Sequence, residues 1–225
     1  MGAHRHNPAF VKDIIIGMSD GLTVPFALTA GLSGVLNVNH LIIVSGLAEI
    51  AAGCISMGLG GYLAGETEVD HYNAALQREY YEIETVPELE LKEVEDALTV
   101  LGVDVHLSKQ VALQISQDKH AWADFMMQVE LRMEKPVAKR ARNSALNIAI
   151  SYLVGGFIPL FPYMITSTNT DGFKLSCTVT ILALFIFGYF KSKVTGQPLI
   201  KGTIKVAAIG IIAAAAAYML AKLVS

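Results

Sequence analysis

Long runs of apolar residues dominate the chain and alternate with short polar segments. A helix that crosses a bilayer needs about 20 predominantly apolar residues. Five stretches meet this condition, at about residues 14–36, 41–64, 144–166, 174–190 and 202–222. They lack the sustained period-two alternation of strands, and an open sheet cannot satisfy its edges in lipid. The pattern therefore predicts an all-α membrane protein with five transmembrane helices.

Residues 66–143 interrupt the apolar pattern between the second and third predicted spans. The whole chain is 53% hydrophobic and only 16% charged, whereas soluble domains carry about a quarter charged residues. The interruption nevertheless holds sixteen of the twenty acidic residues and nine of the seventeen basic ones, a net charge of −7 against +4 elsewhere. We therefore expect transmembrane helices 1 and 2 within residues 10–65, an acidic insert at 66–143, and helices 3–5 within 144–225.

Lysine and arginine gather at alternate ends of the predicted spans, which indicates how the chain crosses the bilayer. Basic residues concentrate on the cytosolic side of membrane proteins. Here they precede spans one and three and fill the connection between spans four and five: Arg5, Lys12, Lys135, Lys139, Arg140, Arg142, Lys191, Lys193, Lys201 and Lys205. The connections 37–40 and 167–173 have none. The N-terminus and the insert are therefore predicted to be cytosolic, and the C-terminus lumenal or extracellular.

Two carboxylates, Asp20 and Glu49, fall inside the predicted spans. An ionisable residue at membrane depth costs a few kcal/mol and is by default a functional-site hypothesis. From the helical rise, Asp20 lies about 9 Å from the cytosolic edge, level with Met57, and Glu49 lies about 12 Å farther across. A carboxylate and a thioether at one level favour a transition metal over Mg²⁺ or Ca²⁺. The alternatives are that Asp20 caps a kink at Pro25, that Glu49 bonds a neighbouring helix, and that Met57 only packs.

The insert is expected to fold as three helices. The first covers about residues 66–83 and can continue the second span without a break. The second covers about 87–101, because it starts at a proline and ends before Gly102. The third runs from Ser108, as its N-cap, to about residue 134.

Glutamates recur at helical spacing in each of these three helices. The pairs are Glu79 with Glu82, Glu90 with Glu93, and Glu130 with Glu134. Residues three or four apart share one helix face, where like charges repel by a few tenths of a kcal/mol. A divalent cation would relieve this repulsion, as in carboxylate sites between bundle helices. The alternative is a solvated acidic surface, although the neighbouring Tyr80, Tyr81, Met126 and Met127 indicate partial burial.

Three segments resemble a known family. They are KDIIIGMSDGLTVPF at residues 12–26, GLAEIAAG at 46–53 with SMG at 56–58, and ETEVDHY at 66–72. Their sequences are similar to the vacuolar iron transporter family of plants and fungi, and above all to its plant members. The resemblance extends over essentially the whole chain.

The resemblance implies a homodimer in the vacuolar membrane that imports Fe²⁺, its substrate, from the cytosol in exchange for protons. Asp20 and Met57 match the family's pathway residues, and Glu49 matches a carboxylate implicated in transport. The family's metal ligands in the insert are matched by Glu79, Glu82, Glu90, Glu93 and Glu130, with Met126 and Met127 nearby. Carboxylate and thioether ligands also accept Mn²⁺, Co²⁺, Ni²⁺ and Zn²⁺. No prosthetic group, nucleic-acid partner or enzymatic activity is expected.

Two other functions fit an acidic helical insert. Carboxylate clusters in helical bundles can house a di-iron oxidase, but that function calls for a Glu-x-x-His pair, and histidine does not follow Glu79, Glu90 or Glu130 at this spacing. The other is a metal-sensing membrane scaffold whose insert binds a partner. Uptake of Fe²⁺ into vesicles under an imposed pH gradient separates both from a transporter.

Overall fold

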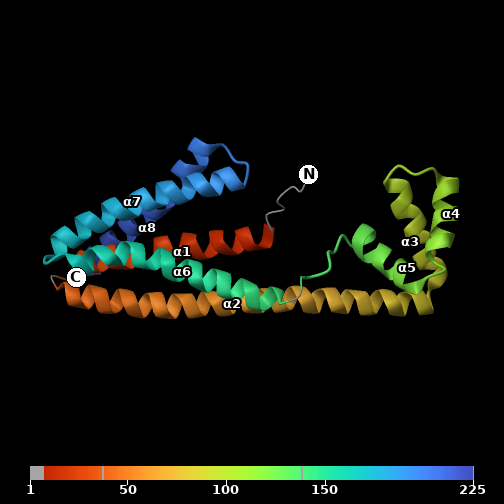
Figure 1. The fold of residues 1–225 in the computed structure, drawn as a ribbon, viewed down its shortest axis with the longest axis horizontal. Coiled ribbons are helices and arrows are strands. Elements are labelled where there is room, and N and C mark those ends of the chain that lie inside the picture. Colours follow the sequence, from red (N-terminus) through yellow and green to blue (C-terminus); the bar gives the residue numbers. More distant parts are fainter. Residues whose placement is uncertain (1–7, 37, 138, 225) are drawn as a thin grey trace, which may run out of the picture. The chain divides into compact units, whose positions relative to one another are not determined.

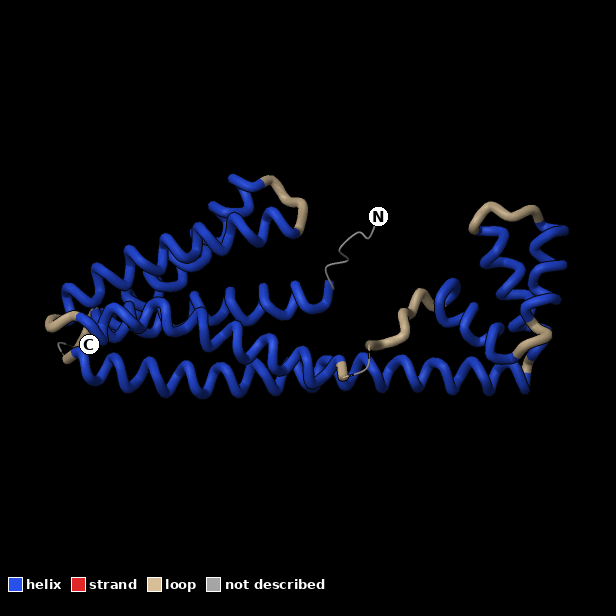
Figure 2. The backbone as a smooth tube through the Cα atoms, viewed as in Figure 1, coloured by secondary structure: helices blue, strands red, loops and turns tan. Residues whose placement is uncertain are grey.

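A computed structural model describes residues 8–36, 38–137 and 139–224. Within these ranges the chain is helical and has no strand (Figures 1 and 2), so the all-α prediction is confirmed. The helices are α1 (Pro8–Ser33), α2 (Asn39–Thr85), α3 (Pro87–Val100), α4 (Val105–Ile115), α5 (Lys119–Phe125), the π-helix η1 (Met126–Glu130), α6 (Arg140–Ile165), α7 (Asn169–Val194) and α8 (Leu199–Val224).

Among the described residues, five helices are long and apolar enough to cross a membrane, namely α1, α2, α6, α7 and α8. This confirms the five predicted spans, although several helices extend beyond the apolar stretches. In α7 the polar ends are helical because Thr168 caps the N-terminus, accepting a hydrogen bond from the amide of Asp171 at 3.2 Å. Lys191 and Lys193 lie in its last turn, where positive charge favours a helix C-terminus.

The chain divides into two compact units. A membrane unit lies within Met1–Leu63 and Ala141–Ser225, and an insert unit comprises Ala64–Arg140. The apolar part of α2 belongs to the first unit and its polar part to the second. The predicted functional division of the chain at residues 66 and 143 stays a prediction.

In the membrane unit, α1 and α6 cross at glycines. A Cβ atom added at Gly17 would collide with the backbone of Ile148, and one added at Gly21 would collide with the backbone of Tyr152. Gly155 of α6 also lies against the α1 backbone, where an added Cβ atom would be 3.0 Å from the amide nitrogen of Leu22. Small residues allow this approach, which stabilises helix pairs in lipid through van der Waals contact.

The prolines leave their helices unbroken. We expect Pro159 and Pro162 to kink or partly unwind the third span, but α6 is helical through both, as α1 is through Pro25. Hydroxyl groups supply extra hydrogen bonds at these points. Ser176 of α7 donates to the carbonyl oxygen of Pro159 at 2.7 Å, and Thr29 donates to that of Pro25 at 2.9 Å. Partial unwinding of α6 is therefore a wrong prediction, whereas a kink at these prolines stays a prediction.

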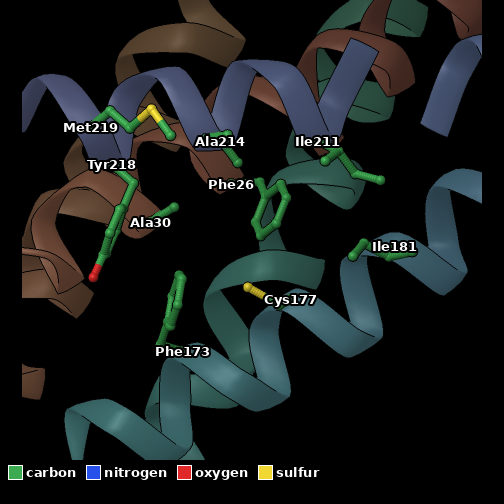
Figure 3. A pocket seen from close by; sticks show the side chains of 10 residues that line it. Phe26, Ala30, Phe173, Cys177, Ile181, Ile211, Ala214, Tyr218 and Met219 are labelled. Atoms are coloured by element: carbon green, nitrogen blue, oxygen red, sulfur yellow. The ribbon is translucent and has the colours of Figure 1, made fainter. Parts of the chain in front are cut away.

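Helices α1, α7 and α8 enclose a wholly apolar pocket of about 230 Å³. Figure 3 shows Phe26 of α1, Phe173 and Cys177 of α7 and Tyr218 of α8 around it. The rings of Phe173 and Tyr218 stack with centroids 5.6 Å apart. The lining of this pocket contains no charged residue.

The insert unit has a core of its own. Ile83, Val94, Trp122 and Met126 come from four different helical segments, and none is more than 5% exposed. The α3 helix ends as predicted before Gly102, which takes a φ of 93° that glycine adopts without strain. Hydrogen bonds around this turn form a Schellman motif, which starts the reversal into α4.

The prediction of one continuous helix over residues 108–134 is wrong. The segment instead contains α4, α5, η1 and a loop. Asp104, and not Ser108, caps α4, because its carboxylate accepts hydrogen bonds from two backbone amides of the first turn at 2.9 and 3.3 Å. Asp118 caps α5 in the same way. Aspartate is a strong N-cap, so two such residues begin two helices.

Candidate metal centre

Three glutamates of the insert unit converge on one point. Glu79 and Glu82 lie on the last turns of α2, and Glu90 lies on the first turn of α3. One carboxylate oxygen from each lies within 4.8 Å of the others. The turn at Val86 brings Glu90 back towards α2, and Pro87 fixes a backbone angle suited to the first position of a helix.

Two of these carboxylates are buried without complete hydrogen bonding. Glu79 and Glu90 are each only 2% exposed. In each, the Oε2 atom is buried and has no hydrogen-bond partner among the described residues. A buried carboxylate is costly to ionise unless it is paired or coordinates a cation. This pair of acids therefore needs either protons or a bound metal ion.

The pKa values of the two buried glutamates are also consistent with a cation site. Burial, followed by the charges of Glu130 and Glu82, raises the pKa of Glu79 to about 7. Burial, followed by the charges of Glu93 and Glu79, raises the pKa of Glu90 to about 7. Both side chains therefore hold a substantial fraction of their protons at neutral pH. A cation that binds there displaces those protons.

One arginine opposes this build-up of negative charge. Arg78 lowers the pKa of Glu79, but its effect is smaller than those of burial, Glu130 and Glu82. Its Nε atom is 3.9 Å from Glu82, and both side chains are exposed. Exposed pairs of this kind contribute under about 1 kcal/mol. Arg78 therefore leaves the acidic character of the site intact.

Glu93 and Glu130 flank the three converging carboxylates. Both line one surface pocket of about 380 Å³ between α3 and η1. Partial burial and the charges of Glu93 and Glu82 also raise the pKa of Glu130. Glu134, by contrast, is exposed in the loop after η1. The pairing of Glu130 with Glu134 on one helix face is therefore wrong, because the helix ends at Glu130.

The methionines of η1 are buried in apolar clusters. Met126 packs in the core beside Ile83 and Val94, and Met127 packs beside Tyr72 and Ala75. Short π-helical turns occur often at functional sites because they shift side chains around the helix axis. The predicted role of Met126 and Met127 as sulfur ligands stays a prediction.

The predicted pathway residues lie on two helices of the membrane unit. Asp20 on α1, Met57 on α2 and Glu49 on α2 are all half-buried. Glu49 accepts a hydrogen bond from the hydroxyl of Tyr152 on α6, and its other oxygen is buried without a partner among the described residues. The backbone of Tyr152 also lies against Gly21, the residue next to Asp20. Their role in transport stays a prediction.

Two polar residues of the membrane unit that form hydrogen bonds between helices were not identified from the sequence. Tyr152 looks like one more aromatic residue in an apolar span, although a tyrosine buried in lipid needs a hydrogen-bond partner. Asp13 lies just outside the predicted first span, but it is 2% exposed in α1. Ser144 of α6 donates to its Oδ1 atom at 3.0 Å, and Asn147 donates to its Oδ2 atom at 3.5 Å. In the sequence, the only indication of this contact is the polar character of the residues around the start of the third predicted span.

Known proteins similar to this chain are named as iron transporters. The model of the VIT family matches residues 11–222. Vacuolar iron transporter 1 of Arabidopsis thaliana is 51% identical over 214 residues, which cover 95% of this chain and 86% of that protein. Vacuolar iron transporter 1 of Oryza sativa subsp. japonica is 47% identical, over 99% and 91% of the two chains. Protein CCC1 of Saccharomyces cerevisiae is 37% identical, over 96% and 70%.

Proposed function

Since the chain belongs to the VIT family, we propose that it transports ferrous iron from the cytosol into the vacuole. Its relatives are named vacuolar iron transporters and not enzymes, in agreement with the expected absence of enzymatic activity. The observation that carries the proposal is the convergence of Glu79, Glu82 and Glu90, two of them buried with unpartnered oxygens. Their chemistry suits capture of a divalent cation.

In this function the insert collects the ion. Glu79, Glu82 and Glu90 bind Fe²⁺ through carboxylate oxygens, and Glu93 and Glu130 add negative charge at the rim. The protons held by the carboxylates leave as the metal binds, because metal ligands must be deprotonated. Met126 and Met127 supply softer sulfur donors next to the acids. Mn²⁺, Co²⁺, Ni²⁺ and Zn²⁺ also suit this ligand set.

Translocation uses the half-buried polar side chains of the membrane unit. Fe²⁺ passes Asp20 and Met57 and leaves near Glu49, and protons move in the opposite direction. The support for this role is that carboxylates inside spanning helices are costly and that one oxygen of Glu49 accepts no hydrogen bond from the described residues. Asp20 or Glu49 then alternates between a protonated and a metal-bound state.

The proposal also includes the oligomeric state of the protein and its orientation in the membrane. The transporter is a homodimer in the vacuolar membrane, with its N-terminus and insert cytosolic and its C-terminus lumenal. Lysines and arginines near the span ends support this orientation, because they gather at alternate ends of the spans.

Uptake by the full-length chain in liposomes tests the function. Fe²⁺ is added outside vesicles with an acidic interior, and its entry is followed with a trapped metal-sensitive dye. We expect rapid uptake that collapses when the pH gradient is dissipated. Absence of uptake under both conditions contradicts transport, whereas uptake that ignores the gradient contradicts proton exchange alone.

Asp20→Ala separates the pathway from the insert. This variant should lose uptake and keep the metal binding of the purified full-length chain. Asp171→Asn, an exposed aspartate at the start of α7, serves as the control and should transport normally. Full uptake by Asp20→Ala rejects the pathway through this residue.

A further inference from the structure

A second groove of the membrane unit lies between the first turns of α1 and the last turns of α7. It has a volume of about 210 Å³, and six of its seven lining residues are apolar: Val11, Ile14, Ile15, Phe187, Phe190, Lys191 and Val194. The three from α1 lie within four residues of one another, and the four from α7 recur at separations of three, four and seven residues. Each helix therefore contributes a single stripe, and the groove runs between two spanning helices.

Lys191 is the one charged group in this lining. Within the described ranges it has no acidic partner, and residues 187–205 contain no aspartate or glutamate. Asp13, the acid in the first turns of α1, is buried and bonded to Ser144 of α6. The positive charge of Lys191 is thus uncompensated by protein at the edge of an apolar groove.

Other lysines strengthen the positive field at this end of the spans. Lys12 and Lys193 are exposed beside the groove without lining it. Basic pockets between transmembrane helices bind the headgroups of anionic lipids, and each lysine near the surface contributes about 1 kcal/mol. A lysine stem can also lie along apolar side chains while its ammonium group reaches the headgroup level.

We propose that this groove binds one anionic glycerophospholipid. An acyl chain lies along Ile14 and Phe190, and the phosphate-bearing headgroup contacts the ammonium group of Lys191. Both parts of the molecule are needed, because a free phosphate leaves the apolar walls uncovered. A second copy of the chain is a less suitable occupant, because burial of Lys191 in a protein interface is costly without a carboxylate opposite it. This site is separate from the proposed iron path and does not depend on it.

Quenching of a tryptophan placed in the groove tests the site directly. Phe190 is 56% exposed, so Phe190→Trp has room for the larger ring. The full chain is reconstituted in phosphatidylcholine containing a minor fraction of either acyl-brominated phosphatidylserine or acyl-brominated phosphatidylcholine. The unmodified chain, whose single tryptophan is Trp122, gives the baseline. We expect the serine lipid to be enriched about fivefold at the reporter, as one lysine contact implies.

Two matched controls test whether the preference for phosphatidylserine is specific to the groove and to Lys191. Tyr189→Trp places the reporter on the neighbouring position of α7, which does not line the groove, and should be quenched equally by both lipids. In the Phe190→Trp chain, Lys191→Gln should abolish the preference and Lys193→Gln should preserve it. Equal quenching at Phe190→Trp, or equal loss with both lysine variants, overturns the proposal. Quenching by neither lipid also overturns it, since protein then covers the groove.

Discussion

Tyr152 of α6 donates its hydroxyl hydrogen to Oε1 of Glu49 in α2, across 103 positions of sequence. The ring of Tyr152 lies against Gly53, one turn beyond Glu49, and its backbone lies against Gly21, next to Asp20. One tyrosine therefore contacts both helices that carry the predicted pathway residues. The bond orients Glu49 and leaves its second oxygen buried without a hydrogen-bond partner among the described residues.

Tyr152→Phe tests whether this orientation matters. The variant keeps the ring that packs on Gly53 and removes only the hydroxyl, so we expect slower Fe²⁺ uptake by about tenfold, as the loss of one buried hydrogen bond of about 1.5 kcal/mol implies. Initial uptake rates in liposomes measure it. Tyr163→Phe is the control on the same helix, because Tyr163 shares a hydrogen bond of 2.7 Å with Ser33 and not with a carboxylate. Equal losses in the two variants would mean that the hydroxyl is merely structural.

Glu90→Gln tests the metal centre with a matched partner. Glu90 is buried among the converging acids, whereas Glu88, two residues earlier on α3, is exposed. Loss of a ligand should weaken Fe²⁺ binding by at least ~10-fold, the lower end of what even outer-shell changes produce. Anaerobic titration calorimetry on the full-length chain measures the affinity and the stoichiometry. Unchanged binding in Glu90→Gln, or equal weakening in Glu88→Gln, contradicts the assignment.

Metal binding should strengthen as the pH rises through about 7. The raised pKa values of Glu79 and Glu90, both about 7, mean that Fe²⁺ must displace protons below this pH and meets ionised ligands above it. Calorimetry in two buffers of different ionisation enthalpy counts the protons released. Binding that is independent of pH between about 6 and 8 would show that these carboxylates are not ligands.

The stability of the metal-free insert should change in the opposite direction. Folding raises the pKa of Glu79 and Glu90 from 4.5 to about 7, so the folded state holds their protons more tightly than the unfolded state. Stability therefore falls as the pH rises from about 4.5 to about 7 and is level beyond it. Fluorescence of Trp122, which is 5% exposed in the insert core, reports the unfolding temperature. Glu79→Gln should reduce this pH dependence and leave the share of Glu90, so a slope unchanged by the substitution points to other groups.

The broad architecture follows from simple physical patterns. Five apolar stretches of sufficient length yield five helices, since lipid leaves the backbone few other ways to satisfy its hydrogen bonds. The end of α3 at Gly102 was equally predictable, because glycine adopts the positive φ of that turn. These features depend on composition and local backbone preference, which a sequence displays directly.

The details of the candidate site depend on contacts that sequence alone does not display. Asp104 and Asp118 cap helices because of where the chain turns, whereas the prediction was one helix from Ser108 to about residue 134. The bond of Tyr152 to Glu49 requires two helices to be packed in a particular register. Spacing predicted that Glu79 and Glu82 share a face, but only the turn at Val86 brings Glu90 to them.

The glycine crossing of α1 and α6 constrains how any transport cycle can proceed. Backbones in contact at Gly17, Gly21 and Gly155 leave no side chains between them to repack. Separation of the two helices would open a void in the bilayer interior, so they are expected to tilt or slide as a single body. Asp20 and Tyr152 are then expected to move together, so the proposed transport cycle requires movement of the helices around this pair to expose Asp20 to each side in turn.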